Sequence, residues 1–220
     1  MPPEIPLQTA MELCGVFAGA LSGGLAGVRK QFDIFGTLVL AWAAGLGGGM
    51  LRDVMIGATP PIGLADWRFI ADACLAGVVM YLFHPRLERA RRMILVLDAG
   101  ALALFAVSGT LKALELGIGG VGAVSAGILT GIGGGVLRDL LTAEVPVVLH
   151  QRQLYAFPAI IGAVATALLW KAGALTPVTA VAAGAGVFAL RVAALRFGLQ
   201  APGPWNGVSW GRKSSGKMEP

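Results

Sequence analysis

Charged side chains are scarce in this sequence. Only 13% of its 220 residues are Asp, Glu, Lys or Arg, whereas about a quarter is usual in soluble proteins. Hydrophobic residues make up 56% and the mean hydropathy is +0.76, so the chain belongs in a lipid bilayer. Each span takes roughly 20 apolar residues, so seven spans use about 140 residues and leave about 80 for connections. This excludes a cytosolic enzyme, a receptor with an ectodomain and a transporter of ten or more spans.

Cysteine and histidine are also rare. Cys14 and Cys74 lie inside apolar stretches, where small buried side chains are much commoner than a disulfide or a metal site. His84 and His150 stand alone near span ends, so neither a metal cluster nor a nucleophilic triad can be assembled. We therefore expect no enzyme activity and no cofactor. The net charge of +5 comes mainly from basic residues in short turns, which are typical topology signals, so no nucleic-acid partner is expected.

Seven apolar runs predict an all-α membrane protein with seven transmembrane helices. Residues 1–200 are expected to form a single transmembrane domain, and residues 201–220, with Pro, Gly, Ser and Lys, a disordered cytoplasmic tail. A six-span alternative stays open because the turn at Pro146 is short and apolar. The predicted spans cover about 10–28, 36–56, 67–84, 93–113, 119–141, 152–171 and 176–197.

The basic residues outside the spans predict the orientation. With seven spans, eleven of them fall on the side of the C-terminal tail and two, Arg68 and Lys171, on the side of the N-terminus. Cytoplasmic turns carry the excess of Lys and Arg, so we expect the N-terminus outside and the C-terminus in the cytoplasm of a cell inner membrane. The eleven are Arg29, Lys30, Arg86, Arg89, Arg91, Arg92, Arg152, Arg196, Arg212, Lys213 and Lys217.

An internal repeat is the strongest signal in the sequence. A shift of 86 positions superposes residues 45–53, GLGGGMLRD, on residues 131–139, GIGGGVLRD, with seven of nine identical. The same shift brings Glu12 onto Asp98. Each copy holds three spans, which predicts that repeat one, 10–84, and repeat two, 93–171, enter the membrane in opposite orientations. Inverted repeats of this kind enclose a pathway near the bilayer midplane.

The last span, 176–197, lies outside both repeats. A role in packing or in contacts between subunits is more common for such a helix than a direct part in function. We expect the pathway to be formed by the two repeats.

A glycine triplet lies within one span of each repeat. Gly47, Gly48 and Gly49, and likewise Gly133, Gly134 and Gly135, cost about 1 kcal/mol each relative to alanine in an ordinary helix. This predicts helix kinks, with interrupted helices whose freed backbone groups face a polar cavity. The alternative is close helix packing alone, although packing glycines usually recur every fourth residue.

An arginine follows each triplet after one turn. Arg52 and Arg138 in mid-span cost at least about 2.5–3.5 kcal/mol, which implies a use for them. Because sequence neighbours point in different directions on a helix, Asp53 and Asp139 are not expected to neutralise them. The expected partners are carbonyl groups freed at a helix break or an acid on a neighbouring span. The alternative is that both guanidinium groups reach the membrane surface and anchor the fold.

Other polar groups within the spans are weaker evidence. Several hydroxyl groups can line a wet pathway, although bonding back to their own helix is commoner: Ser22, Ser108, Thr110, Ser125 and Thr130. Asp98 can attract cations or pair with a basic loop. Lys112, at the end of span four, is expected to extend its amino group to the membrane surface.

The paired motifs, in three-span repeats with a seventh helix, resemble the prokaryotic branch of the trimeric intracellular cation (TRIC) channel family. The resemblance covers about residues 10 to 197. It implies a homotrimer in membrane lipid, with a pore in every subunit for monovalent cations, chiefly potassium with some sodium. Spans one, two, four and five would surround the pore. Three-span relatives of this family are described as glycine transporters.

Carried over to this sequence, the resemblance assigns the gate to Arg52 and Arg138 and the kinks to the two glycine triplets. Animal members carry a lysine motif in this place and bind acidic phosphoinositides between subunits, so a bound lipid is left open for this chain. We expect the two arginines to be held aside by hydrogen bonds in the open pore and to swing inward when it shuts. Asp and Ser groups would supply cation affinity. A small-solute carrier and a structural membrane protein are the competing hypotheses.

Overall fold

The computed structural model describes residues 7–84, 87–150 and 155–199, and within these ranges the chain is helical and contains no strand. The predicted all-α class is therefore confirmed for this part of the chain. The predicted tail, 201–220, lies outside the described residues. The helices are α1 Leu7–Arg29, α2 Ile34–Met55, α3 Ile62–Ala65, α4 Trp67–Phe83, α5 Leu87–Glu115, α6 Gly120–Leu141, α7 Val147–His150, α8 Ala156–Lys171 and α9 Pro177–Phe197.

Seven of these helices fall on the seven predicted spans. Five of them, α1, α2, α5, α6 and α9, contain a stretch that is long and apolar enough to cross a membrane. The other two, α4 and α8, have 17 and 16 residues and are shorter than a typical span of about 20 residues. The one-turn helices α3 and α7 were not predicted.

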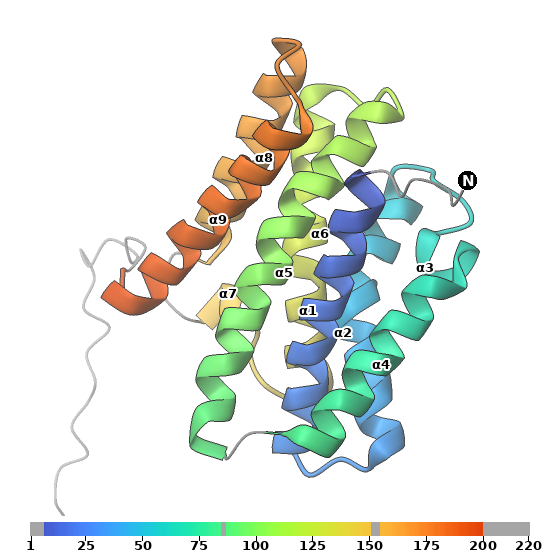
Figure 1. Ribbon diagram of the computed structural model, residues 1–220, viewed down its shortest axis with the longest axis vertical. Helices are drawn as coiled ribbons and strands as arrows, with labels where there is room; N and C mark the ends of the chain where they lie inside the picture. Colours follow the sequence, from blue (N-terminus) through green and yellow to red (C-terminus); the bar gives the residue numbers. More distant parts are fainter. Residues whose placement is uncertain (1–6, 85–86, 151–154, 200–220) are drawn as a thin grey trace, which may run out of the picture.

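Four helices form the centre of the bundle. Helix α1 packs against α2 and α5, and α6 packs against α2 and α5. Helix α4 covers α1 and α2, α8 covers α5 and α6, and α9 packs against α5 and α8 (Figure 1). In Figure 1, α1 runs downward and α5, its counterpart in the second repeat, runs upward.

The ends of the helices follow local chemistry. The side chain of Asp33 caps α2 by accepting a hydrogen bond of 2.7 Å from the backbone N–H of Gly36. Thr176 and Thr179 form a reciprocal capping box at the start of α9, and Gly198 ends that helix in the left-handed conformation. These signals fix the helix lengths and thus the depth of the side chains that follow.

The glycine triplets lie where α2 and α6 cross. A Cβ atom on Gly48 would overlap the carbonyl oxygen of Thr130, and one on Gly134 would overlap the carbonyl oxygen of Ala44. Both helices continue without interruption through their triplets. The predicted break with freed backbone groups is therefore wrong, because the glycines serve close contact between backbones. A bend at these positions stays a prediction.

Candidate functional site

Arg52 is the centre of a buried charge cluster near the end of α2. Its side chain is 1% exposed, and its Nη1 atom lies 2.8 Å from Oε1 of Glu12 on α1. Its Nε donates to Oδ1 of the adjacent Asp53 over 3.0 Å. An acid on a neighbouring span is thus a partner, as predicted from the sequence.

Asp53 joins this cluster to two further elements. Nζ of Lys112, on α5, lies 2.8 Å from Oδ1 and 2.9 Å from Oδ2 of Asp53. The backbone N–H of Ile62, the first residue of α3, donates to Oδ2 over 2.9 Å. The carboxylate is fully buried and binds α2, α3 and α5 together.

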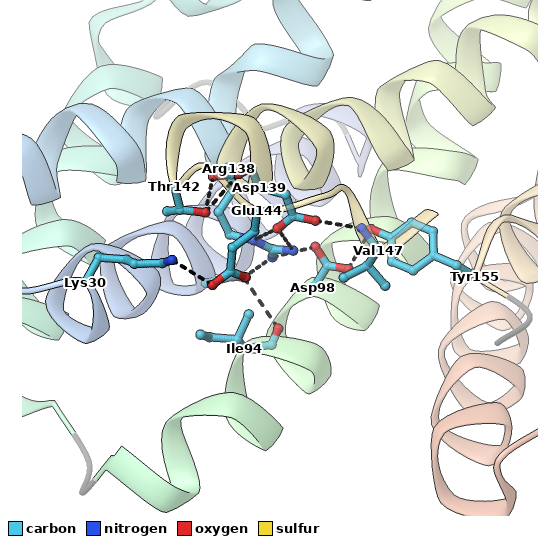
Figure 2. Close-up of polar contacts among 10 residues, drawn as sticks. Lys30, Ile94, Asp98, Arg138, Asp139, Thr142, Glu144, Val147 and Tyr155 are labelled. Atoms are coloured by element: carbon cyan, nitrogen blue, oxygen red, sulfur yellow. Dashed lines mark hydrogen bonds and ion pairs between the residues drawn. The ribbon is translucent and has the colours of Figure 1, made fainter. Parts of the chain in front are cut away.

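Arg138 holds the corresponding position near the end of α6. Its Nη1 lies 2.8 Å from Oδ1 of Asp98 on α5 and donates to Oγ of Ser22 on α1 over 2.6 Å (Figure 2). Its Nε donates to Oδ1 of Asp139 over 2.9 Å. Oδ2 of Asp139 accepts from the backbone N–H of Val147, the first residue of α7, just as Asp53 accepts from α3.

Tyr155 completes the Arg138 cluster from the other side of Asp98. Its buried hydroxyl donates to Oδ2 of Asp98 over 2.6 Å, so both carboxylate oxygens of Asp98 have partners. The guanidinium of Arg191, on α9, lies over the Tyr155 ring at 4.4 Å from its centre, a cation–π contact. Helix α9, predicted only to pack, thereby reaches the Arg138 cluster through one residue.

The two clusters are not equivalent. The 86-residue shift brings Phe69, which has no hydroxyl, onto Tyr155. Within the part of the chain that the structure describes, Oε2 of Glu12 in the Arg52 cluster is buried without a hydrogen-bond partner. The Arg138 cluster is therefore the more completely bonded of the two.

Two expectations about the charged residues are wrong. Each arginine does pair with the aspartate that follows it, because the long side chain folds back and brings Nε beside the neighbouring carboxylate. Lys112 binds Asp53 rather than the membrane surface, since a buried carboxylate lies within its reach. The anchoring alternative for the arginines also fails, because Arg52 is 1% and Arg138 3% exposed.

The predicted hydroxyl groups are used unevenly. Ser22 joins the Arg138 cluster, whereas Ser108 is buried and makes no hydrogen bond that the structure describes. Thr110, Thr130 and Ser125 bond back to carbonyl groups of their own helices. These three are local helix contacts and carry no evidence for a wet pathway.

Three residues of the site were missed or undervalued in the sequence. Glu12 was noted only because the repeat brings it onto Asp98, and no role was assigned to Arg191 or Tyr155. The repeat shift held the signal, since Tyr155 against Phe69 is a polar change at a duplicated position. A single buried tyrosine is otherwise indistinguishable from an ordinary core residue.

Three cavities follow the contacts between α1, α2, α5 and α6. A vestibule of about 370 Å³ leads to Arg138 and Asp139. A cavity of about 10 Å³ is lined by Asp98, Gly135 and Arg138. Another of about 10 Å³ lies at the other cluster and is lined by Glu12, Gly49 and Arg52.

The mouth of the vestibule carries a salt bridge. Nζ of Lys30 lies 2.9 Å from Oε1 of Glu144, and both side chains are partly exposed and line the vestibule (Figure 2). The hydrogen bond from Lys30 lowers the pKa of Glu144 below its ordinary value, against a smaller opposing effect of burial. Glu144 is therefore ionised and paired at neutral pH.

A family model described as glycine transporter matches the chain twice, over residues 9–85 and 95–171. The chain belongs to this family. The two matches are offset by 86 residues, which is the shift that superposes the glycine and arginine motifs. The duplication therefore extends over the whole glycine transporter unit and not only over those motifs.

Relatives from several bacteria have names that give a location but no activity. A UPF0126 membrane protein of Deinococcus radiodurans is 47% identical over 176 residues, with 80% of this chain and 81% of the relative covered. The UPF0126 inner membrane protein YadS of Escherichia coli is 34% identical, with 87% of this chain and 93% of the relative covered. This glycine transporter family member is a multi-pass membrane protein.

Solved structures connect the family to channels. The TRIC trimeric intracellular cation channel orthologue from Rhodobacter sphaeroides is 35% identical, with a TM-score of 0.82, 87% of this chain and 98% of that chain covered. A second solved structure, from work on the structural basis for conductance through TRIC cation channels, is 30% identical with a TM-score of 0.79. The match covers 89% of this chain and 96% of that chain. The predicted resemblance to the TRIC family is confirmed. The structural neighbours of this chain are cation channels, not enzymes.

Proposed function

We propose that this protein is a monovalent cation channel, chiefly for potassium, with a pore inside each subunit of a homotrimer. The pore would run between α1, α2, α5 and α6. One observation carries this proposal: two buried arginine clusters stand at the ends of a row of cavities among these four helices, and a vestibule leads to one of them. Buried charges within membrane spans are rare and commonly mark an ion pathway, and here both arginines lie in the last turn of their helices.

The arginines would set the electrostatic barrier of this pore. At about 4 Å and an effective dielectric constant near 20, two like charges repel by about 4 kcal/mol, enough to stop a cation. Arg52 and Arg138 are held by carboxylates, so their charge is largely compensated in this conformation. Loss of those contacts would turn a positive group toward the ion, while Asp53, Asp139 and Asp98 would attract it.

The membrane arrangement is part of the same proposal. All seven long helices would span the bilayer as two inverted three-helix repeats plus α9, with the N-terminus outside and the C-terminus in the cytoplasm. The opposite directions of α1 and α5 in Figure 1 support the inversion. Large exposed apolar side chains on α8 and α9, among them Leu168 and Val178, suit lipid and the other subunits of a trimer.

Alanine at either arginine tests the proposed gate. In planar bilayers, Arg52→Ala and Arg138→Ala should each change the open probability of single channels, because each removes a charge and leaves acids unpaired. Arg68→Ala is a matched control, since this arginine is exposed and pairs only locally with Asp66. Unchanged gating in both cluster variants, with the same unitary current, would contradict a role of the two arginines in gating.

A small-solute carrier, for example for glycine, is the second candidate, and the match to the glycine transporter family favours it. A carrier would bind its substrate between the same inverted repeats and alternate access to the two sides. In proteoliposomes, a coupled carrier concentrates labelled glycine and shows no unitary currents. A channel passes ions until electrochemical equilibrium and shows unitary events.

A further inference from the structure

One aromatic side chain separates the two small cavities. Phe105, on α5, lines the cavity that contains Glu12 and Arg52, and it also lines the cavity that contains Asp98 and Arg138. Its side chain is buried, with 4% exposed. The two cavities are separate, and Phe105 is the one residue that lines both.

Helix α1 is built to accept this ring. A Cβ atom on Gly15 would lie 2.8 Å from Cε1 of Phe105, so a side chain at this position would push the ring away. The 86-residue shift brings Gly19, which lines the cavity beside Asp98, onto Phe105. At this pair of duplicated positions, one repeat therefore supplies a ring and the other supplies space.

We propose that Phe105 is the constriction of the pathway, an apolar plug between the two charged ends of the pore. This rests on the proposed channel function and identifies the narrowest point. The arginines are already held by their carboxylates in this conformation, yet the two small cavities do not join. Closure here comes from the ring.

The physics of small apolar constrictions supports this assignment. A cavity of about 10–15 Å³ holds about one water molecule, so each of the two small cavities, at about 10 Å³, has room for about one. A row of water molecules along the pathway would therefore be interrupted at the ring. An apolar ring offers no hydrogen bonds to replace the shell of a hydrated cation, and hydrophobic constrictions gate pores by excluding water. A smaller apolar side chain would let water continue.

The test is a size series at position 105. Phe105→Leu, Phe105→Val and Phe105→Ala should raise osmotic water permeability of proteoliposomes in stopped-flow scattering, in that order and by several-fold for alanine. The open probability of single channels should rise in the same order. Leu25→Ala is the control, because Leu25 is equally buried on α1 but lines none of these cavities. Circular dichroism and size-exclusion chromatography would establish that each variant folds. If Phe105→Ala does not fold, the Leu and Val variants still test the predicted order of water permeability and open probability.

The outcomes separate this inference from the channel proposal. Unchanged water permeability and gating throughout the series, with a wild type that conducts, would overturn the plug while leaving the channel. An increase in Leu25→Ala equal to that in the series would also overturn it, since any loosening of the core would then suffice. A rise in water permeability without ion currents in any variant would keep the plug and reject the channel.

Discussion

At the scale of single residues, Tyr155 links the outer helices to the buried Arg138 cluster. Its hydroxyl donates to Asp98 over 2.6 Å while its ring receives Arg191. Phe at this position keeps the ring but leaves Oδ2 of Asp98 buried without a donor. We expect Tyr155→Phe to destabilise the protein by about 1–3 kcal/mol, measured by denaturant unfolding in detergent micelles.

Tyr81→Phe is the matched control, because Tyr81 is exposed on α4 and its hydroxyl makes no hydrogen bond that the structure describes. It should change stability by less than about 0.5 kcal/mol. If the two variants were equally stable, the bond between Tyr155 and Asp98 would have no energetic importance.

The salt bridge at the vestibule mouth predicts a dependence on salt and pH. In Lys30→Met, Glu144 loses the partner that lowers its pKa and becomes a free carboxylate at the entrance. Unitary potassium conductance should rise at low ionic strength and match the wild type near 1 M salt, where charges are screened within about 3 Å.

The pH dependence has a defined sign. The pKa of Glu144 in the wild type is lowered, so its charge and its pairing persist above the ordinary carboxyl value and are lost as the pH falls through the lowered pKa. Without Lys30 the pKa returns toward its ordinary value, so the gain in conductance should vanish at a higher pH than the one that breaks the wild-type bridge. Lys30→Met with Glu144→Gln should show no gain, and a persisting gain would contradict the explanation.

The sequence could predict which residues carry charge in the membrane but only part of their pairing. Intramembrane arginines need acids, and Asp98 on a neighbouring span was an available one. The bond from each arginine to the next aspartate escaped prediction because Cβ directions alone ignore how far a guanidinium can fold back. Tyr155 escaped because its partner comes from a distant element.

At the scale of elements, the glycines of each triplet lie against different neighbours. Gly48 and Gly134 allow the backbones of α2 and α6 to touch. Gly49 instead lies beneath the arginine one turn later, where a Cβ would stand 4.0 Å from Arg52 Nη2, whereas a Cβ on Gly135 would stand 2.7 Å from the hydroxyl of Tyr155 and 2.9 Å from Oδ1 of Asp98. Three glycines in a row therefore serve a helix crossing and a polar cluster at once.

Gly48 and Gly49 offer a matched pair of substitutions. Gly48→Ala should destabilise the fold by about 1–3 kcal/mol, because its methyl group overlaps the carbonyl of Thr130 and must separate two helices. Gly49→Ala should be tolerated or stabilise by up to about 1 kcal/mol, since alanine favours a helix and its Cβ approaches only Arg52 Nη2, at 4.0 Å.

Unfolding in micelles measures both variants under one condition. Equal losses of stability at the two positions would show that the triplet acts through helix bending rather than through the contact with Thr130.

Helix positions were predictable because long apolar runs are unambiguous in a membrane protein. The predicted spans and the observed helices differ mainly at their ends, as for 93–113 against α5 Leu87–Glu115. Helices α3 and α7 were not predictable from hydropathy, since one turn is too short to give a period. Buried aspartates that accept their first N–H groups stabilise them.

At the scale of the whole molecule, the two repeats share their charged motif but differ in the residues around it. The repeats retain the arginine, the aspartate after it and an acid on the neighbouring helix. They differ at Phe69 against Tyr155 and at Gly19 against Phe105. One end has a bonded cluster behind a vestibule of about 370 Å³, and the other has a cavity of about 10 Å³ at Arg52.

The duplication was predictable from the sequence because the motif is long and specific, and the family matches repeat it with the same offset. The difference between the ends was not, since it depends on which side chains converge from α1, α5 and α8. The trimer and the orientation in the membrane stay predictions, since one chain without its membrane and partners does not test them.

The most direct measurement of the central claim is the reversal potential of single-channel currents from the purified full chain in planar bilayers, recorded in a potassium gradient and then with sodium on one side. The account predicts unitary currents that reverse near the potassium equilibrium potential, with sodium permeating less. A reversal at the chloride equilibrium potential, or the absence of unitary events from folded protein that concentrates a solute, would contradict it.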